Sequence, residues 1–307
     1  MRVLVIGATG FIGLPVSQAL VRSGHVVYGL TRKADKARQL QAEEITPIIG
    51  EYVEPAKWLT PSLVGTLDVV INAVGAEVRL ADPEADVRVF KTLLEVAQQS
   101  RPTHAPKLTH IFTTGTLAYG QDPREVVNDT TAIPLEKLAD FVKPFLNLEQ
   151  DILHNPALNT IIIRPGFVYG RSGSLLASLF AQAKEGNTIK RYGAPGGRLN
   201  TVHTDDLANL YLLAAEKAQL VGGNIFAGVN DSTESVDDIL QSLVAISGAK
   251  GYEYVEPTNP FEAAAGFTNI LRPYLGRTLL GWRPVKASFV DHLQIYFDSW
   301  KASSGTA

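Results

Sequence analysis

The chain is 307 residues long, carries a formal net charge of −3 and contains no cysteine. Its length fits one large α/β domain with an appended lobe, or two small domains. The missing thiols exclude disulfides, thiolate metal sites and thiol nucleophiles, and the near-neutral charge gives no electrostatic case for nucleic acid or an anionic membrane.

Two further absences narrow the class of protein. The six histidines include no HxxxH or HxH pair, so no histidine metal site is predicted. Strand-forming residues begin at Val3, and no apolar run approaches the length of a membrane span. We therefore expect a cytoplasmic protein with neither nucleic acid nor a membrane as its partner.

A glycine-rich stretch at residues 7–13 has the context of a dinucleotide-binding turn. It follows an apolar run at residues 3–6 and precedes a helical pattern. Because glycine lacks a Cβ, Gly7 can form the tight turn, Gly10 can admit a pyrophosphate, and Gly13 can let helix and strand pack closely. The helix start offers unpaired N–H groups and a positive dipole end to phosphates. Strand, glycines and helix together predict dinucleotide binding, whereas a bare βα turn would need only two glycines.

The next strand, predicted over residues 26–30, ends in Thr31, Arg32 and Lys33. In dinucleotide folds the tip of this second strand meets the adenosine ribose, where an Asp or Glu would hold the 2′-hydroxyl of NAD. Two cations suit a 2′-phosphate instead, with the Arg32 guanidinium stacked or forked onto it. The sequence therefore favours NADP(H) over NAD(H), and the alternative is a solvated basic turn.

Strands and helices alternate through the first half of the chain. The fourth strand opens into the small residues Ala73, Val74 and Gly75, which leave room for a nucleotide. This alternation predicts an α/β fold, a Rossmann-type doubly wound parallel sheet that binds ligands beyond the strand carboxyl ends. The predicted helices span residues 34–42, 55–63 and 82–100, and the predicted strands span residues 45–49, 67–72 and 108–113.

The second half is less regular. We predict a dinucleotide-binding domain at residues 1–170, rejoined by segments near residues 198–232. Residues 171–197 and 233–301 would form a smaller, discontinuous C-terminal lobe, and residues 302–307 a flexible tail. Further strands are predicted at residues 160–164 and 224–227, and further helices at residues 134–154, 205–217, 236–247 and 287–301.

Five ordered motifs lie at residues 7–13, 68–73, 113–115 with 119–120, 164–170 and 202–208, and a late one lies at residues 280–284. Together they resemble the extended branch of the short-chain dehydrogenase/reductase family, the NAD-dependent epimerase/dehydratase group. The resemblance covers nearly the whole chain. It implies a nucleotide-binding sheet, a smaller substrate lobe and a cleft between them.

The resemblance also implies where a cofactor would be held. The pyrophosphate would lie on the glycine turn and the 2′-phosphate on the basic tip. The adenosine and nicotinamide halves would lie at later strand ends. The pyrophosphate would contact Gly7, Thr9, Gly10, Phe11, Ile12 and Gly13, and the 2′-phosphate would contact Thr31, Arg32 and Lys33. The adenosine half would lie at Ala73, Val74 and Gly75, and the nicotinamide half at Thr113, Pro165, Gly166 and Phe167.

Relatives that oxidise or reduce carry a tyrosine and a lysine four residues apart on one helix, and this pair is missing. The tyrosine exchanges a proton with the substrate oxygen as hydride moves, and the lysine lowers the pKa of the tyrosine. None of the ten tyrosines has a lysine four residues later. With the helix registered on Glu149, Phe141 and Phe145 stand at the tyrosine and lysine positions, and Gly115 stands at the usual serine.

The two phenylalanines predict a pocket more apolar than that of relatives acting on nucleotide sugars, which favours a hydrophobic small molecule. Phe141 and Phe145 could equally be core residues. Tyr169 and Arg198 would also border the pocket. For Arg198, an anion clamp and a plain surface arginine are both open. Pro144 would interrupt the helix that carries the phenylalanines, or open a new one at its first turn.

Another group must then move the proton. The candidates are Tyr119, Tyr169, His203, Lys143 and a water held by Thr114, with Thr116 on the other side of Gly115. For His203 the alternative is a structural role at the start of the following helix.

Three functions remain open. The first is an NADP(H)-dependent oxidoreductase with an unusual proton donor. The second is a lyase, isomerase or cyclase in which the bound cofactor is redox-silent, and the third is a non-enzymatic nucleotide-sensing protein. The substrate-lobe motifs favour an enzyme. The family also suggests a homodimer through the helices near residues 82–100 and 134–154.

Overall fold

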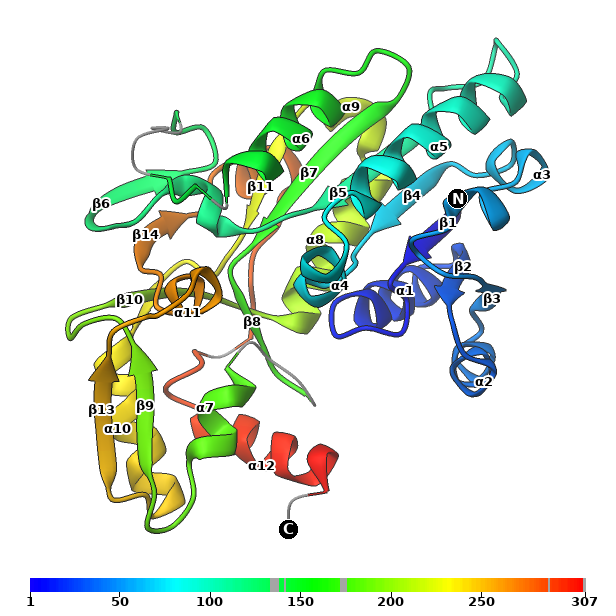
Figure 1. The fold of residues 1–307 in the computed structure, drawn as a ribbon. Helices are drawn as coiled ribbons and strands as arrows, with labels where there is room; N and C mark the ends of the chain where they lie inside the picture. The colour runs from blue at the N-terminus through cyan, green and yellow to red at the C-terminus, as the bar shows by residue number, and fades with distance from the viewer. Residues whose placement is uncertain (133–137, 141, 172–175, 287, 306–307) are drawn as a thin grey trace. The chain divides into compact units, whose positions relative to one another are not determined.

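The computed structural model describes residues 1–132, 138–140, 142–171, 176–286 and 288–305 (Figure 1). The chain divides into two compact units, each assembled from three separate stretches. The first unit comprises Met1–Thr114, Asn147–Ile163 and Ala208–Ile225, and the second comprises Gly115–Leu146, Arg164–Leu207 and Phe226–Ala307.

A seven-stranded sheet organises the first unit, with the strand order β11-β7-β5-β4-β1-β2-β3. Neighbouring strands from β7 to β3 pair in parallel. The order reverses between β1 and β4, the switch point at which such sheets bind ligands. This confirms the predicted α/β fold with a Rossmann-type sheet. The strands are β1 (Arg2–Ile6), β2 (Val26–Thr31), β3 (Thr46–Ile49), β4 (Val69–Asn72), β5 (Thr109–Thr113), β7 (Asn159–Pro165) and β11 (Ile225–Gly228).

Helix α5 buries one apolar face. Val89, Phe90 and Leu93 of α5 are buried at helical spacing, and Figure 1 shows α5 in front of the sheet and α8 behind it. The helix predicted from residue 82 begins only at Ala85, because Pro83 disfavours helical backbone at Asp82. The helices are α1 (Gly13–Arg22), α2 (Ala34–Ala42), α3 (Pro61–Val64), α4 (Ala76–Ala81), α5 (Ala85–Ser100), α6 (Lys143–Leu153), α8 (Thr204–Glu216) and α9 (Ala218–Val221), with a 3₁₀ turn at Pro55–Lys57.

A buried polar network fixes the carboxyl end of β4. The Arg79 guanidinium lies 2.8 Å from the Asp86 carboxylate, and both side chains are at least nine-tenths buried. The Tyr52 hydroxyl donates to the same carboxylate, and the Asn72 amide donates to Tyr52 at 2.8 Å. Burial, together with the charge of Asp86, raises the pKa of Tyr52. The network ties α4 and α5 to the last residue of β4.

The second unit contains three small sheets and an aromatic core. The sheet orders are β12-β10-β8, β13-β9 and β14-β6. The Tyr169 ring contacts Phe289 at 5.1 Å and Tyr296 at 4.9 Å between centroids. The strands are β6 (Asp122–Asn128), β8 (Phe167–Tyr169), β9 (Thr188–Tyr192), β10 (Arg198–His203), β12 (Thr233–Ser235), β13 (Gly251–Val255) and β14 (Asn269–Arg272). The helices are α7 (Ala177–Gln182), α10 (Val236–Ser247), α11 (Pro260–Ala265) and α12 (Leu293–Ser304), with a 3₁₀ turn at Thr116–Tyr119 and a π turn at Gly276–Leu280.

The boundaries of the two units differ from those of the predicted domains. Gly115–Leu146 belongs to the second unit, although it precedes residue 170. β10 pairs with β8 and β12 rather than with the large sheet. The sequence could not predict this pairing, because the pattern of a strand does not specify its partner strands. α12 runs to Ser304, into the predicted tail.

The helix predicted over residues 134–154 also differs in its start. α6 begins at Lys143, with Pro144 in its first turn. Proline is tolerated there, because the N–H groups of the first turn form no hydrogen bonds within the helix. The beginning of the predicted helix lies outside the described residues.

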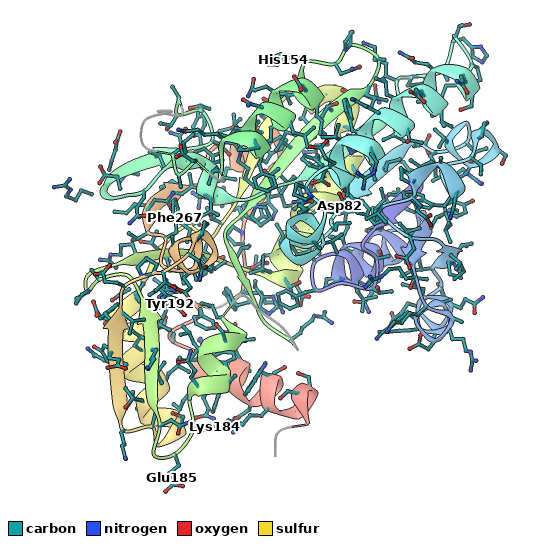
Figure 2. The ribbon with its side chains drawn as sticks, in the orientation of Figure 1. Asp82, His154, Lys184, Glu185, Tyr192 and Phe267 are labelled. Carbon is teal, nitrogen blue, oxygen red and sulfur yellow. The ribbon has the colours of Figure 1, made fainter. Side chains whose placement is uncertain are left out.

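Removing the Asp86 carboxylate should destabilise the first unit strongly. Asp86→Ala leaves Arg79 charged and buried without its partner, and we expect the free energy of unfolding to fall by about 3–5 kcal/mol. Asp82→Ala removes a half-exposed carboxylate from a salt bridge with Arg88, at a cost of about 1 kcal/mol or less. Asp82 is labelled in Figure 2. Urea unfolding followed by circular dichroism measures both, and equal costs would contradict the role given to the network.

A second expectation concerns pH. His110 of β5 is 1% exposed, stacks on Phe90 at 6.0 Å, and has no hydrogen-bond partner for either ring nitrogen within the described chain. Burial lowers the pKa of His110 from 6.5 to about 4. Below pH 6.5, His110 is therefore protonated in the unfolded chain but stays neutral in the folded chain until the pH nears 4. The free energy of unfolding falls as the pH falls, by about 3 kcal/mol near pH 4.

The test compares the free energy of unfolding at pH 7 and pH 4.5 for three proteins. We expect His110→Leu to lose less stability across this interval than the wild type. His104→Leu changes an exposed histidine and should keep the wild-type difference. The expectation is wrong if His110→Leu also keeps it.

Candidate functional site

The glycine turn of the first unit brings the end of β1 against the start of α1. Gly7 has a φ of +86°, a left-handed conformation that favours glycine. A Cβ on Gly13 would lie 2.1 Å from the Gly7 carbonyl oxygen, and a Cβ on Gly7 would lie 2.8 Å from the Ala73 carbonyl oxygen. The Gly10 N–H group donates to the Gly7 carbonyl at 2.8 Å and closes the turn. Backbone contacts therefore require glycine at positions 7 and 13.

Helix α1 presents a bare N-terminus at this turn. No side chain caps it, and its first turn holds no acidic residue. Gly10 is exposed, and Thr9 and Ile12 are half-buried, so the helix end is accessible. Uncapped N–H groups at the positive end of a helix dipole suit a diphosphate. The residues of the turn therefore fit the pyrophosphate of a dinucleotide, and Phe11 lies within the same turn.

The carboxyl ends of β2, β4 and β5 lie at the same edge of the sheet as this turn, because these strands run parallel. Ala73 donates its N–H group to the Ile6 carbonyl at 2.9 Å, which places residues 73–75 beside Gly7. Ala73 and Val74 are buried and Gly75 is exposed. The Thr113 hydroxyl is buried and hydrogen-bonded to the Tyr211 hydroxyl at 2.6 Å. The Thr113 hydroxyl is therefore engaged with helix α8.

The basic tip follows directly on β2. Thr31 is buried, and its carbonyl accepts the Gly50 N–H group at 3.0 Å. Arg32 and Lys33 are exposed and form no ion pair with any residue that the structure describes. Two unpaired cations at the end of the second strand can both turn toward an anion.

The residues predicted to hold the nicotinamide half fall in both units. Thr113 belongs to the first unit, whereas Pro165, Gly166 and Phe167 belong to the second. A Cβ on Gly166 would lie 2.5 Å from the Asn200 carbonyl oxygen, so this glycine is required by packing. Phe167 begins β8 and is half-buried.

The two threonines beside Gly115 differ in their surroundings. The Thr114 hydroxyl donates to the carboxylate of Glu149, a buried residue of α6. Thr114 is therefore engaged with α6. Thr116 is 5% exposed and opens the 3₁₀ turn at Thr116–Tyr119.

Two other candidate proton donors lie within the second unit. Tyr119 is 5% exposed, and the Arg164 guanidinium carbon lies 4.8 Å from the centre of its ring. Lys143 is the first residue of α6, and its ammonium donates to the exposed Asp140 carboxylate at 2.6 Å. An exposed pair of this kind contributes little to stability, so the Lys143 ammonium is free to change partner.

His203 has a structural position. Its Nδ1 accepts the Asp205 N–H group at 3.1 Å, in the first turn of α8. Its ring contacts Tyr169 edge-on at 5.3 Å, and a Cβ on Gly170 would lie 2.2 Å from Nε2. Burial lowers the pKa of His203, against the opposing charge of Asp205. These contacts favour the structural alternative for this histidine.

Tyr169 and Arg198 do not share a surface site. Tyr169 is fully buried, and burial raises its pKa. Arg198 is exposed at the start of β10, where its backbone N–H group donates to the Thr268 hydroxyl. Phe145 is half-buried on α6, and Phe141 lies outside the described residues.

Two sequence motifs prove to be coupled structurally. The Trp282 indole N–H group donates to the Asp206 carbonyl at 2.9 Å, and the Lys286 N–H group donates to the Asp206 carboxylate at 2.9 Å. The segments that carry the motifs at residues 202–208 and 280–284 are thus joined by hydrogen bonds within the second unit.

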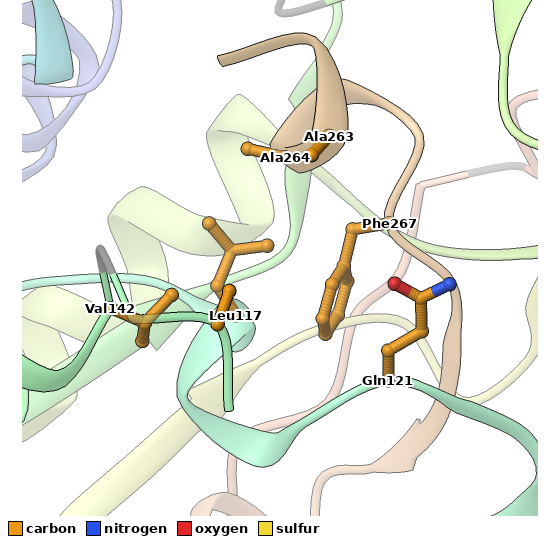
Figure 3. Close-up of a pocket in the computed structure, with 7 residues that line it drawn as sticks. Leu117, Gln121, Val142, Ala263, Ala264 and Phe267 are labelled. Atoms are coloured by element: carbon orange, nitrogen blue, oxygen red, sulfur yellow. The ribbon is translucent and has the colours of Figure 1, made fainter. Parts of the chain in front are cut away.

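An apolar pocket lies within the second unit (Figure 3). Its space, including the open mouth, is about 350 Å³. Figure 3 shows Leu117 and Val142 on one side and the Phe267 ring on the other, with Gln121 beside Phe267. The lining residues are Leu117, Gln121, Ala139, Val142, Ala263, Ala264 and Phe267.

Sequence reasoning missed this pocket. Leu117 and Gln121 flank Tyr119 in the chain, and Val142 separates Phe141 from Lys143, so half of the wall adjoins predicted site residues. The other half comes from α11 and Phe267, more than a hundred residues later. Nothing in the pattern of that segment signals its partner, and only the fold brings the two halves together.

Comparison with known proteins places the chain in a family. The family model described as NAD dependent epimerase/dehydratase family matches residues 3–227. A ketoreductase of Stigmatella aurantiaca, which acts on 4-hydroxy-2-methyl-3-oxo-4-farnesyl-3,4-dihydroquinoline-1-oxide, is 28% identical over 92% of this chain and 81% of its own length. A UDP-glucose 4-epimerase of Mycolicibacterium smegmatis is 28% identical over 92% of this chain and 94% of its own length.

Solved structures agree on the fold. The UDP-glucuronic acid 4-epimerase of Bacillus cereus, in complex with UDP-glucuronic acid and NAD, superposes with a TM-score of 0.78, at 22% identity over 98% of this chain and 99% of that chain. The fold is therefore that of an extended short-chain dehydrogenase/reductase. The chain belongs to the NAD dependent epimerase/dehydratase family, whose members are NAD(P)-dependent oxidoreductases and epimerases. No helix in the described ranges is both long and apolar enough to cross a membrane.

Gly13→Ala should disrupt the turn that would hold the cofactor. The added methyl group overlaps the Gly7 carbonyl, so the backbone must shift, and we expect NADPH affinity to fall by about 10-fold or more. Gly75→Ala places its methyl group in open space and should leave the melting temperature unchanged. Calorimetric titration with NADPH and thermal unfolding measure the two effects. Unchanged NADPH binding by Gly13→Ala would contradict the assignment of the turn.

Proposed function

We propose that the protein is an NADP(H)-dependent oxidoreductase that interconverts an apolar ketone and its alcohol, with a proton donor other than a tyrosine–lysine pair. The observation that carries this proposal is the pocket of the second unit. Its lining adjoins the predicted catalytic positions in the chain, and within the described ranges it offers a single polar side chain, Gln121.

The first unit supports the choice of cofactor. The glycine turn and the uncapped start of α1 suit a pyrophosphate. Arg32 and Lys33 would neutralise a 2′-phosphate, and no carboxylate stands at the end of β2 to hold a free 2′-hydroxyl. NADP(H), when bound, would supply or accept the hydride.

The pocket supports the class of substrate. A nucleotide sugar carries two phosphates and several hydroxyl groups, and it needs cations and hydrogen-bond partners around it. Among the described residues, the pocket lining includes no charged side chain. The ketoreductase relative acts on a farnesylated dihydroquinoline oxide, a largely apolar compound that carries a ketone. A substrate of this kind suits the pocket better than a sugar does.

Lys143 is the proton donor that we favour among the candidates. It directly follows Val142 of the pocket wall, and its ammonium forms an exposed salt bridge with Asp140. Thr114 is engaged with Glu149, Tyr169 is fully buried, and His203 accepts the hydrogen bond at the start of α8. An ammonium group near the substrate oxygen would donate the proton as the hydride arrives.

The proposal predicts NADPH oxidation with aromatic or prenylated ketones. Purified protein is mixed with NADPH or NADH and a panel of such ketones, and the loss of absorbance at the nicotinamide band is followed. We expect turnover with NADPH, and we expect Arg32→Ala to weaken NADPH binding about 10- to 100-fold while NADH binding changes little. Arg22→Ala changes an exposed arginine at the end of α1 and should affect neither cofactor.

Other outcomes separate the alternatives. Equal losses of NADPH and NADH affinity in Arg32→Ala would overturn the choice of cofactor. Binding of NADPH without turnover of any ketone would overturn the oxidoreductase proposal. Conversion of a ketone without loss of NADPH would then indicate a lyase or isomerase, and no conversion at all would indicate a sensing protein.

A further inference from the structure

We infer that the pocket of the second unit selects ligands that combine a flat apolar body with one hydrogen-bond-accepting oxygen, and that the Gln121 amide is the specificity-determining contact with this oxygen. The inference rests on the proposed function in taking the pocket as the place of the substrate. It goes further in naming the polar feature that the substrate must carry and the residue that reads it.

One wall of the pocket is held by a small core. Leu117 and Val142 pack in a cluster with Ala118, Leu138 and Leu146, and Val142 is 6% exposed. A side chain packed in this way keeps its rotamer, so the wall is formed before a ligand arrives. Leu117 contributes the remaining methyl groups on this side (Figure 3).

The opposite wall is anchored at both ends of α11. Asn259 caps the helix by accepting the Glu262 N–H group at 3.0 Å, and the Arg191 guanidinium donates to the Ala265 carbonyl at the other end. The Phe267 N–H group donates to the Ala264 carbonyl at 3.3 Å, which places the Phe267 ring against the pocket. The two walls thus face each other as aliphatic side chains against an aromatic ring, an arrangement suited to a flat apolar group.

Small residues set the depth of the pocket. Ala263 and Ala264 present only methyl groups between the walls (Figure 3). A larger side chain at either position would occupy the space that a ligand needs.

Gln121 is the single polar side chain among the lining residues that the structure describes, and its backbone is fixed on both sides. The carbonyl of the preceding residue, Gly120, accepts the Asn269 side-chain amide at 3.1 Å, and the following residue, Asp122, pairs with Asn269 across β6 and β14. The Gln121 amide itself is exposed and makes no hydrogen bond to any described residue. It therefore keeps two N–H donors for a ligand, at a position fixed relative to the Phe267 ring.

This arrangement favours ligands that carry a hydrogen-bond acceptor over hydrocarbons of the same shape. A carbonyl or N-oxide oxygen on the ligand would accept from the Gln121 amide and gain a hydrogen bond. A hydrocarbon of the same shape would fill the pocket but leave the amide to water. Water competes at this exposed amide, so the expected preference is moderate, about 3- to 10-fold.

The test measures binding without cofactor, so that it does not depend on turnover. Equilibrium dialysis gives the affinities of 2-acetylnaphthalene and 2-ethylnaphthalene, which share one shape and differ in the carbonyl oxygen. We expect the wild type to prefer the ketone about 3- to 10-fold. Gln121→Leu should bind the hydrocarbon at least as well and lose the preference, and Gln121→Glu should lose it as well because a carboxylate has no donor.

Two further variants test whether the pocket is the binding place. Ala264→Phe should abolish binding of both probes. Val126→Leu changes an exposed residue of β6 outside the pocket and should leave both affinities unchanged. Circular dichroism confirms that each variant is folded, and Gln121→Glu decides the matter should Gln121→Leu fail to fold.

Three results would overturn the inference: no binding of either probe to the wild type, equal affinities for the two probes, or a ketone preference that survives both Gln121 substitutions. Unchanged binding by Ala264→Phe would also overturn it. These outcomes are distinct from failure of the proposed function, because a protein that binds ketones selectively but never oxidises NADPH satisfies the inference and refutes only the oxidoreductase.

Discussion

The contact between Gly13 and the Gly7 carbonyl is the constraint on which the first unit depends. No side chain fits between these two backbones, so the first residue of α1 packs against the turn that follows β1. The helix start lies without a side-chain cap beside the point where the strand order reverses. The same approach that packs helix on sheet therefore creates the site suited to a diphosphate.

The second unit contains an apolar wall around Val142 and Leu117. None of the ten tyrosines of the sequence has a lysine four residues later, and the proposed function takes this wall as the surroundings of a substrate that is oxidised or reduced without a tyrosine–lysine pair. An apolar wall suits a substrate with few polar groups, because such a substrate offers few groups to orient. Under the proposed function, the proton comes from a group at the edge of the pocket, the role that we propose for Lys143.

The sequence was sufficient for the fold and for the glycine turn, because both depend on local patterns. Alternating apolar strands and helices predict a parallel sheet, and three spaced glycines after a strand predict the turn. The pocket was beyond such reasoning, because Leu117 and Phe267 meet only through the pairing of β6 with β14. The sheet that β10 joins was also beyond such reasoning, since a strand pattern does not state which strands it pairs with.

A crystal structure of the protein grown with NADP⁺ tests the central claim most directly. We predict that the diphosphate lies against the start of α1, between Gly7 and Gly13, and that the 2′-phosphate lies within hydrogen-bond distance of the Arg32 guanidinium. A dinucleotide bound away from this turn, or a 2′-phosphate that touches neither Arg32 nor Lys33, would contradict it.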